Sequence, residues 1–282
     1  LKEHFDEENI VYWMAFQILM GNVDTQNRNV YLYSPLNSDI WYFIAWDNDG
    51  CLMRPEYELR NFSDQNSWEK GISNYWGNIL FQRCLKSRSF REKLNDAILD
   101  LREYLNKDML TSKIESYKNV LKPYLYLMPD AEYEPLTSEQ YDQIAASLPD
   151  EIEKNYQLYL ESLETPMPFY IGVPTIDGDK LKFNWDVSYD LDAEDITYSV
   201  EVAGDYLFRD VIYQNTTLTV PEAEMDLPKA GQYFVRVRAT NTSGKTQDAF
   251  DYYVTDEGKY YGMRCFYITE DSTVEEDDYE EG

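Results

Sequence analysis

GNVDTQNRNVYLY at residues 21–33, followed by WYFIAWDNDG at residues 41–50, joins a polar loop to two short apolar runs. The loop offers no apolar surface to bury, so we expect it at the surface or along a cleft. The two runs are rich in aromatic and β-branched residues, which predicts a β-hairpin. Antiparallel pairing would bring Asn29, at the start of one strand, close to Asp47, after the end of the other. Two such side chains could share a cation.

Asp24, Asn29 and Asp47 follow one another in an order that suits phosphoryl transfer from a metal-bound nucleotide. One carboxylate can accept the proton of the attacking hydroxyl, while an amide and a second carboxylate hold metal ions on the phosphates. Asp49 is either a further ligand or a solvated turn residue. Asn27 competes for the metal role, but only Asn29 lies five residues after Asp24. Taken singly, each of these motifs is also typical of a plain turn.

The pattern Gly-Asn-x-Asp-x-x-x-x-Asn-x-Tyr-Leu-Tyr, with Trp-Tyr-x-Ile-x-Trp-Asp-x-Asp after it, resembles the C-terminal lobe of the spore-coat CotH kinase family. These are atypical protein kinases. The resemblance covers residues 5–60 well and residues 75–165 loosely. It implies a nucleotide-binding lobe before residue 1, which this chain does not contain. Because the chain also begins at Leu1 rather than Met, we expect it to be part of a longer protein.

The resemblance also implies a role for each residue of the motif. Asp24 matches the catalytic-loop Asp and Asn29 the metal-binding Asn. Asp47 matches the Asp that ligates Mg²⁺ in the place of the Asp-Phe-Gly motif, with Asp49 as a candidate additional ligand. The implied cofactors are ATP and Mg²⁺ or Mn²⁺, and the implied substrate is a secreted, surface or spore-coat protein. The expected function is an atypical protein Ser/Thr kinase.

Composition excludes several other classes of function. The 282 residues carry a formal net charge of −28 without a basic cluster, which argues against a nucleic acid or an anionic membrane as partner. No apolar run approaches the length of a transmembrane helix. His4 is the only histidine, so His-based metal sites and Ser-His-Asp catalysis are excluded. Cys51, Cys84 and Cys265 form no disulfide framework and are expected to be structural thiols.

Helical periodicity dominates the first half of the chain. The clearest helix is predicted over residues 6–20, capped by Asp6 and ended by Gly21. Residues 51–72 show little periodicity and predict a long loop. In kinases this segment carries activation and substrate loops, but a long polar loop is more often a plain surface loop. Further helices are predicted over residues 76–104, with a break at 86–89, over residues 108–125, and over residues 137–162.

Local signals place the ends of these later helices. Ser89 with Glu92, and Thr137 with Gln140, have the spacing of capping boxes. The helix over residues 108–125 is expected to end near Pro123, because proline cannot donate the backbone hydrogen bond that continues a helix.

A domain boundary is predicted at residues 165–168, where two prolines follow a long helix. Beyond it, apolar residues alternate with a period of two, as at Leu181, Phe183 and Trp185. About seven short strands with an early tryptophan predict a β-sandwich.

The run from Leu227 to Asn241 resembles the fibronectin type III signature, within a match over residues 168–256. By this resemblance Trp185 is the strand-B tryptophan and Tyr233 the corner tyrosine, and both are core residues. Such modules are mostly spacers or binding platforms of extracellular proteins. The expected location is therefore extracellular or at the cell surface.

The predicted fold class is α+β. An α-rich kinase C-lobe with a small site-bearing hairpin (residues 1–165) precedes an all-β, immunoglobulin-like sandwich (residues 166–256) and an extra strand with an acidic tail (residues 257–282). The alternative function is a non-catalytic cell-surface scaffold or adhesion protein whose sandwich binds a protein or glycan. An exposed aromatic row would favour a glycan, since aromatic faces stack on sugars. The candidates for such a row are Tyr206, Phe208 and Tyr213.

Overall fold

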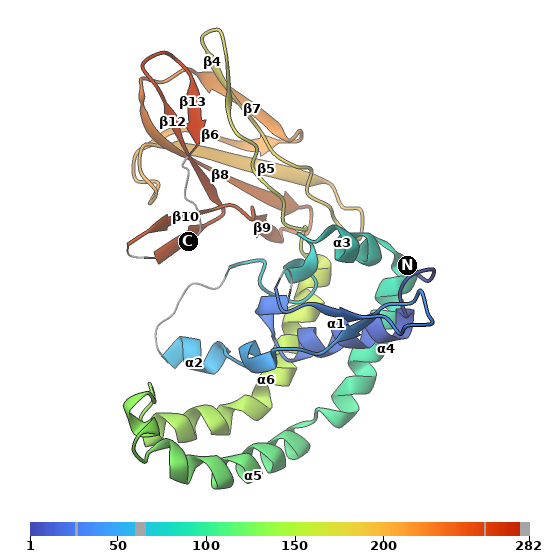
Figure 1. The fold of residues 1–282 in the computed structure, drawn as a ribbon. Coiled ribbons are helices and arrows are strands. Elements are labelled where there is room, and N and C mark those ends of the chain that lie inside the picture. The colour runs from blue at the N-terminus through green and yellow to red at the C-terminus, as the bar shows by residue number, and fades with distance from the viewer. Residues whose placement is uncertain (26–27, 60–65, 257, 277–282) are drawn as a thin grey trace. The chain divides into compact units, whose positions relative to one another are not determined.

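The computed structural model describes residues 1–25, 28–59, 66–256 and 258–276. It divides into two compact units, of which the first is mainly helical and the second mainly built of strands (Figure 1). This mixture of helix and sheet agrees with the predicted α+β class. Unit 1 comprises Leu1–Ser63 and Lys70–Leu160, and unit 2 comprises Asp64–Glu69 and Glu161–Gly282.

Unit 1 contains long helices, short 3₁₀ turns and one hairpin. The helices are α1 (Glu7–Leu19), α2 (Arg54–Leu59), α3 (Ile79–Lys86), α4 (Arg88–Tyr104), α5 (Lys107–Leu125) and α6 (Ser138–Glu164), whose last residues belong to unit 2. The 3₁₀ turns are η1 (Val23–Thr25), η2 (Asn48–Gly50), η3 (Ser73–Tyr75) and η4 (Asp130–Glu132). The hairpin pairs β1 (Tyr31–Tyr33) with β2 (Tyr42–Ile44).

α1 confirms the helix predicted over residues 6–20. The Asp6 carboxylate accepts a hydrogen bond from Asn9 N at 2.8 Å and caps the first turn. Gly21 follows the helix with a φ of +60°. This left-handed conformation is unfavourable for residues that have a Cβ atom, so glycine suits the position. α1 packs against α4. The buried residues on these two helices include Ile10, Met14, Ile18, Phe90, Leu94 and Ile98.

Aromatic side chains join α1 to the hairpin and to α3. The Trp13 ring lies 4.9 Å from that of Phe43 on β2 and 5.6 Å from that of Phe81 on α3, measured between centroids. Tyr75 of η3 completes the cluster, 5.4 Å from Phe81. All four side chains are buried. The elements around the predicted site are therefore packed on one aromatic core.

The predicted hairpin is confirmed, with Leu32 opposite Phe43 in antiparallel register. Asn9 ties it to α1, because its side chain accepts a hydrogen bond from Phe43 N at 2.6 Å and donates one to Phe43 O at 3.1 Å. The aromatic side chains of Tyr31 and Trp46 remain 50% and 51% exposed, and their rings lie 4.8 Å apart.

One predicted helix cap differs from the structure. The break between α3 and α4 is confirmed, but its capping residue is Ser87 and not Ser89. The extended backbone of Ser87 alone turns the chain from one helix into the next, so Ser89 lies within α4. α5 ends at Leu125, two residues after Pro123, in agreement with the predicted helix over residues 108–125. The box of Thr137 and Gln140 is confirmed, since each backbone N–H bonds the other residue's side chain, at 2.9 and 3.2 Å.

The loop predicted over residues 51–72 contains a helix, α2. Pro55 lies in its first turn, where a helix has no backbone partner for the missing N–H, and Glu56 favours the positive end of the helix dipole. The prediction of a loop at residues 60–65 falls outside the described residues.

Unit 2 contains two main sheets and a separate hairpin. The smaller sheet has the order β3 (Thr175–Asp177), β4 (Lys180–Asn184), β7 (Glu222–Asp226). The larger has the order β13 (Val274–Glu276), β12 (Met263–Ile268), β8 (Gly231–Asn241), β5 (Ile196–Ala203), β6 (Val211–Leu218), with β9 (Thr246–Asp248) also paired to β8. The hairpin is formed by β10 (Tyr252–Thr255) and β11 (Gly258–Tyr261).

The predicted alternation along the strands is confirmed by burial. Leu181, Phe183, Val200, Val202, Val235 and Val237 belong to one core and are at most 1% exposed. Trp185 lies in the same core, and Tyr233 packs against it while its hydroxyl donates to Lys229 O at 2.9 Å. Both residues are therefore structural, as the sequence predicts.

The strand expected near the C-terminus is present as β12, which pairs with β8 along the larger sheet. Of the predicted acidic tail, Glu275 and Glu276 lie in β13. The remainder of the tail falls outside the described residues. The three cysteines are free thiols, and Cys84 and Cys265 are buried.

The aromatic row that would favour a glycan is not exposed. Phe208 is 9% exposed and lies under the Arg236 guanidinium, 4.0 Å from the ring centroid. Tyr206 packs on Tyr260, with ring centroids 4.7 Å apart, and Tyr213 packs against the core. These residues are ordinary packing residues.

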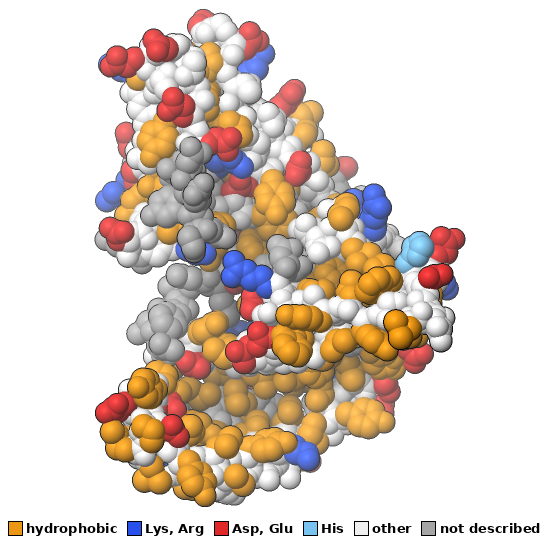
Figure 2. Space-filling view, in the orientation of Figure 1, with side chains coloured by type: hydrophobic (Ala, Val, Ile, Leu, Met, Phe, Trp, Pro, Cys, Tyr) orange, Lys and Arg blue, Asp and Glu red, His pale blue; other side chains and the backbone are white. Residues whose placement is uncertain are grey.

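An exposed apolar stripe runs along α5. Tyr117, Val120 and Tyr124 are 62%, 62% and 66% exposed, and Figure 2 shows hydrophobic side chains gathered around this part of unit 1. Lys122 points away from the stripe, towards Asp142 of α6, with which it forms an ion pair. Among the described residues, no helix combines the length and apolarity needed to cross a membrane.

Replacing Asp6 with Ala is expected to lower the free energy of unfolding by about 1 kcal/mol, because the first turn of α1 loses its cap. Urea denaturation followed by far-UV circular dichroism measures the change. Asp6→Ser, which keeps a capping oxygen, is the control. Equal stability of the Ala and Ser variants would contradict the capping role.

Candidate active site

Buried amide side chains hold the loop that follows α1. Asn22 is 2% exposed, and its Oδ1 accepts a hydrogen bond from Asp24 N at 3.3 Å. Its Nδ2 donates to Asn48 Oδ1 at 3.5 Å, and the same oxygen accepts from Gln17 Nε2 at 3.0 Å. Because Asn48 follows Asp47, these amides connect the backbone at Asp24 to the backbone at Asp47.

Residues of η3 fix the other side of the loop. Thr25 Oγ1 and Tyr75 OH form a buried hydrogen bond of 2.9 Å, and Asn74 Nδ2 donates to Val23 O at 3.4 Å. Burial raises the pKa of Tyr75, so its hydroxyl stays neutral. The backbone around Asp24 is therefore held from two sides, while the Asp24 side chain itself is exposed.

Asn29 points its amide at Asp24. Its Nδ2 donates to Asp24 Oδ2 at 2.8 Å, and its backbone has a φ of +54°. Such a conformation is uncommon except for Gly, Asn and Asp. Because the amide nitrogen is used by Asp24, the oxygen of Asn29 is the atom left to face a cation.

Asp47 and Asp49 add two carboxylates beside Asp24. The negative charge of Asp49 raises the pKa of Asp47, and loss of hydration to neighbouring atoms, a hydrogen bond with Asp49 and the charge of Asp24 act in the same direction. Asp47 also has a left-handed backbone, with a φ of +50°, at the start of η2. The site therefore concentrates negative charge at the surface of unit 1, and a bound cation would relieve that repulsion.

Gly50 allows the two halves of the site to approach each other. A Cβ on Gly50 would lie 2.9 Å from Asn22 Oδ1 and 3.7 Å from Asp24 Cβ. The next residue, Cys51, is unsuited to be a nucleophile, because burial raises its pKa to about 12 even though a hydrogen bond from Asn22 opposes the shift.

The oxygen atoms of this site suit Mg²⁺ or Mn²⁺, which prefer carboxylate, carbonyl and water ligands. Within the described part of the chain, no three carboxylates, thiolates or imidazoles group closely enough to hold a metal ion by themselves. A metal ion here would need further ligands, and phosphate oxygens and water usually complete the coordination of Mg²⁺ on a nucleotide.

Of the predicted site residues, Asn29 is bonded to Asp24, and Asp47 lies near enough to Asp49 and Asp24 for their charges to raise its pKa. Their catalytic and metal-binding roles stay predictions. Asn27, the competitor of Asn29, falls outside the described residues. The sequence analysis missed the supporting amides of Asn22 and Asn48. Gln17 could have indicated these amides, because a polar residue on the apolar face of the first helix needs a buried hydrogen-bond partner.

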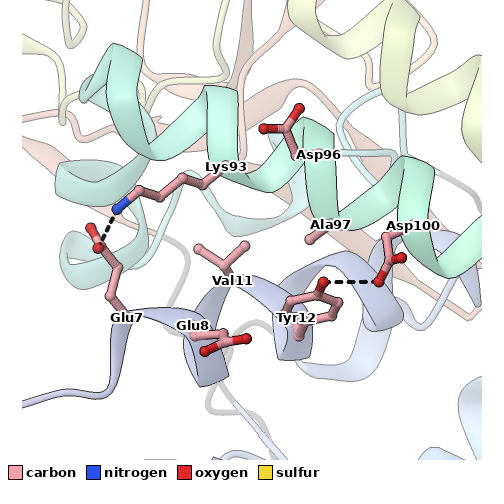
Figure 3. A pocket seen from close by; sticks show the side chains of 8 residues that line it. All are labelled: Glu7, Glu8, Val11, Tyr12, Lys93, Asp96, Ala97 and Asp100. Atoms are coloured by element: carbon pink, nitrogen blue, oxygen red, sulfur yellow. Dashed lines mark hydrogen bonds and ion pairs between the residues drawn. The ribbon is translucent and has the colours of Figure 1, made fainter.

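A groove elsewhere on unit 1 is separate from these residues (Figure 3). It lies between α1 and α4 and has a volume of about 450 Å³. Two pairs of its polar groups are bonded to each other, since Lys93 binds Glu7 and the Tyr12 hydroxyl donates to Asp100 at 2.8 Å. The carboxylates of Glu8 and Asp96 also line the groove.

A model of the family described as CotH kinase protein matches residues 1–159. The chain belongs to the CotH kinase family. The description of this family is that of a kinase. Of unit 2, the match includes only residues 64–69. It therefore does not bear on the fibronectin type III resemblance, which concerns residues 168–256.

No match was found among curated proteins. The solved twitchin kinase region from C. elegans (Fn31-NL-kin-CRD-Ig26) is 16% identical with a TM-score of 0.25, over 34% of this chain and 20% of that chain. Surface layer protein SbsC, domains 1-6, is 13% identical with a TM-score of 0.18, over 97% of this chain and 38% of that chain. The chain thus spans less than half of either structure, and scores this low carry no argument about its fold.

Asp47→Asn is expected to raise the melting temperature at neutral pH in the absence of divalent cations. The pKa of Asp47 is higher in the folded than in the unfolded chain, so its contribution to stability falls as pH rises through the folded-state value. The gain should disappear in acid, where the wild-type carboxyl is also neutral. Thermal unfolding across this pH range, with Asp39→Asn as the control, measures the effect. A gain that persists in acid would contradict the charge repulsion.

Proposed function

We propose that this chain contributes the catalytic loop and metal ligands of an atypical protein Ser/Thr kinase of the CotH type. The observation that carries the proposal is the 2.8 Å hydrogen bond from Asn29 to Asp24, with Asp47 close enough for its pKa to respond to the Asp24 charge. The order of these three residues is the order in which kinases place a base and two metal ligands.

In the proposed mechanism, Asp24 orients the Ser or Thr hydroxyl of the substrate and accepts its proton. Its exposed carboxylate is accessible to a protein substrate, and the Asn29 amide limits its rotation. Asn29 Oδ1 and Asp47 would hold the metal. Mg²⁺ or Mn²⁺, when bound, neutralises phosphate charge. The chain itself contributes mainly positioning, through the amides beneath the loop.

Electrostatics makes the metal ion essential to this proposal. Asp24, Asp47 and Asp49 face the same region, and the whole chain has a formal net charge of −28. Free ATP would be repelled by such a field, whereas the metal complex of ATP brings positive charge to the carboxylates. Activity should therefore require the divalent ion and not merely increase with it.

We also propose that Tyr31 and Trp46 contact the nucleobase. Both rings are about half exposed, and Trp46 directly precedes the metal ligand Asp47. Paired exposed aromatic rings form a surface on which a base can stack. The adjacency of Trp46 to Asp47 in the chain supports a base-binding role for this pair.

The remaining proposals concern location and substrate. We propose that residues 1–165 form the kinase lobe, that residues 166–256 form a fibronectin type III-like sandwich, and that residues 257–282 add a strand and an acidic tail. The two-sheet arrangement and the Tyr233 hydrogen bond to Lys229 support the sandwich. An extracellular or surface location and a surface or spore-coat protein substrate follow from the two resemblances.

Asp24→Asn and Asp47→Asn are each expected to abolish phosphate transfer, since one removes the proton acceptor and the other a metal ligand. The measurement is incorporation of label from [γ-³²P]ATP with Mg²⁺ or Mn²⁺, into the full-length protein itself and into casein. Asp39→Asn, an exposed carboxylate in the link between β1 and β2, is the control and should retain activity.

Transfer that persists in Asp24→Asn would refute the catalytic assignment. Absence of transfer in the wild-type protein, together with no metal-dependent thermal shift from ATP, would instead favour the non-catalytic scaffold. The two results are distinguishable because the first requires an active enzyme and the second an inactive one.

Tyr31→Ala and Trp46→Ala are expected to raise KM for ATP by about tenfold each with little change in kcat, because stacking on a base contributes about 1–3 kcal/mol. Initial rates at varied ATP concentration measure the change. Tyr33→Ala is the control, since Tyr33 lies on the same strand and is 54% exposed. An equal rise in KM for Tyr33→Ala would contradict a specific contact by the Tyr31 and Trp46 pair.

A further inference from the structure

Arg54, the first residue of α2, contacts α6 through both terminal nitrogens of its guanidinium. Nη1 donates to Glu151 Oε2 at 3.0 Å, and Nη2 donates to Asn155 Oδ1 at 2.6 Å. Glu151 and Asn155 lie four residues apart on α6, so they share one face of the helix. All three residues belong to unit 1. Because the guanidinium is planar, these two bonds fix the start of α2 on α6 in both position and orientation.

This contact is shielded from water. The Glu151 side chain is 1% exposed and the Arg54 side chain 19% exposed, and Asn155 is buried. The second oxygen of Glu151 accepts a hydrogen bond from Lys154 Nζ at 2.6 Å. Separating a buried ion pair leaves charge without compensation, so the pair opposes movement of α2 away from α6.

Asn155 also holds the end of α1. Its Nδ2 donates to Leu19 O at 2.9 Å. Leu19 is the last residue of α1, where carbonyl groups have no partner within the helix. The fit is close, because a Cβ on Gly21 would lie only 2.7 Å from Asn155 Nδ2. With its oxygen bonded to Arg54 and its nitrogen to Leu19, the Asn155 amide is fixed in one orientation.

The segments held by α6 are those that flank the candidate active site. Asp24 lies three residues after Gly21, and Leu52 lies five residues after Asp47. Leu52 N donates to Met20 O at 2.8 Å, which bonds the segment before the Asp24 loop to the segment after the Asp47 turn. α6 therefore supports the backbone on one side of each carboxylate, within a few residues of it.

Arg54 is committed to this contact and is not available to phosphate. Its two terminal nitrogens are bonded to α6, and a buried carboxylate offsets its charge. To bind a nucleotide, the guanidinium would have to leave Glu151, and this would leave a buried charge without its partner. The contribution of Arg54 to the site is therefore geometric.

We propose that Arg54 and Asn155 are positioning residues, which set the separation between Asp24 and Asp47. Asn155 holds the segment that leads into the Asp24 loop, and Arg54 holds the segment that follows the Asp47 turn. The inference rests on the proposed function, because Asp24 is taken as the proton acceptor and Asp47 as a metal ligand. It gives α6, which carries none of the proposed site residues, a part in phosphate transfer.

Asn155→Ala in the full-length protein is the first test, because it removes a neutral side chain and keeps the ion pair of Arg54 with Glu151. Misplacement of Asp24 should lower kcat by about tenfold to a hundredfold, and misplacement of Asp47 should raise the Mg²⁺ concentration needed for half-maximal activity. KM for ATP at saturating Mg²⁺ should change by less than about threefold.

Arg54→Lys is the second variant. Lysine keeps a positive charge beside Glu151 but lacks the guanidinium fork, so it cannot bond Glu151 and Asn155 in the same geometry. The expected result is a loss of kcat in the same direction as in Asn155→Ala, again with little change in KM for ATP. A rise in KM for ATP without loss of kcat would show that Arg54 binds the nucleotide, and would overturn the inference.

Arg102→Ala is the matched control. Arg102 lies on α4 and forms an ion pair with Glu153, which is also on α6, and its guanidinium lies 3.6 Å from the centroid of the Tyr156 ring. The variant removes an arginine contact with the same helix but none of the bonds to α1 or α2. Its kcat and Mg²⁺ dependence should equal those of the wild type. An equal loss in Arg102→Ala, or wild-type kcat in Asn155→Ala, would overturn the inference.

Hydrogen–deuterium exchange provides a readout that does not depend on activity. Exchange at the backbone amides of residues 22–24 and 52 should increase in Asn155→Ala and remain unchanged in Arg102→Ala. If the wild-type protein transfers no phosphate, the proposed function fails, and exchange alone decides whether α6 holds these segments. Unchanged exchange at these amides in Asn155→Ala would overturn the inference.

Discussion

Repulsion among the carboxylates of Asp24, Asp47 and Asp49 is the constraint around which the site of unit 1 is organised. Exposed like charges separate unless the backbone that carries them is fixed. Here the fixing groups are neutral amides, in which Asn48 Oδ1 accepts hydrogen bonds from both Gln17 and Asn22. Neutral groups hold the geometry without cancelling the charge, so the negative potential remains available to a cation. A lysine in the place of Gln17 would stabilise the carboxylates but would also compete with the metal.

Asp24, Asn29, Asp47 and Asp49 were predicted from the sequence, and the supporting amides of Asn22 and Asn48 were not, for a physical reason. Asp24, Asn29 and Asp47 lie in an order set by chemistry, which can be recognised without knowing the fold. The contact of Gln17 with Asn48 joins residues 31 positions apart, and only the packing of η2 against α1 brings them together. Polar residues at apolar positions of a helix, as Gln17 is, are the sequence signal for such contacts.

The fold of each unit followed from periodicity where an element packs on one face. α1 and the strands that line the core of unit 2 were predicted for this reason. Short elements were not predicted, because the backbone conformation of a single turn determines where they begin and end. Ser87 and Ser89 are equivalent as capping residues, and only the backbone conformation of Ser87 selects it. α2 depends on Pro55 in its first turn, in a segment whose composition otherwise indicates a loop. The assignment of residues 66–69 to unit 2 depends on contacts with residues some 180 positions later, which no local pattern encodes.

The burial of Trp68 also bears on how this architecture can change in evolution. A module joined to its neighbour by one linker can be lost, duplicated or exchanged at little cost. Here a second stretch of chain enters unit 2, so removing everything after residue 165 would expose a tryptophan and leave the Ser67 hydroxyl without its bond to Gln247. A related protein that lost residues 166–282 would also have to change residues 66–69, because Trp68 and Ser67 would lose their partners. Residues 66–69 and the C-terminal part of unit 2 are therefore expected to be inherited together.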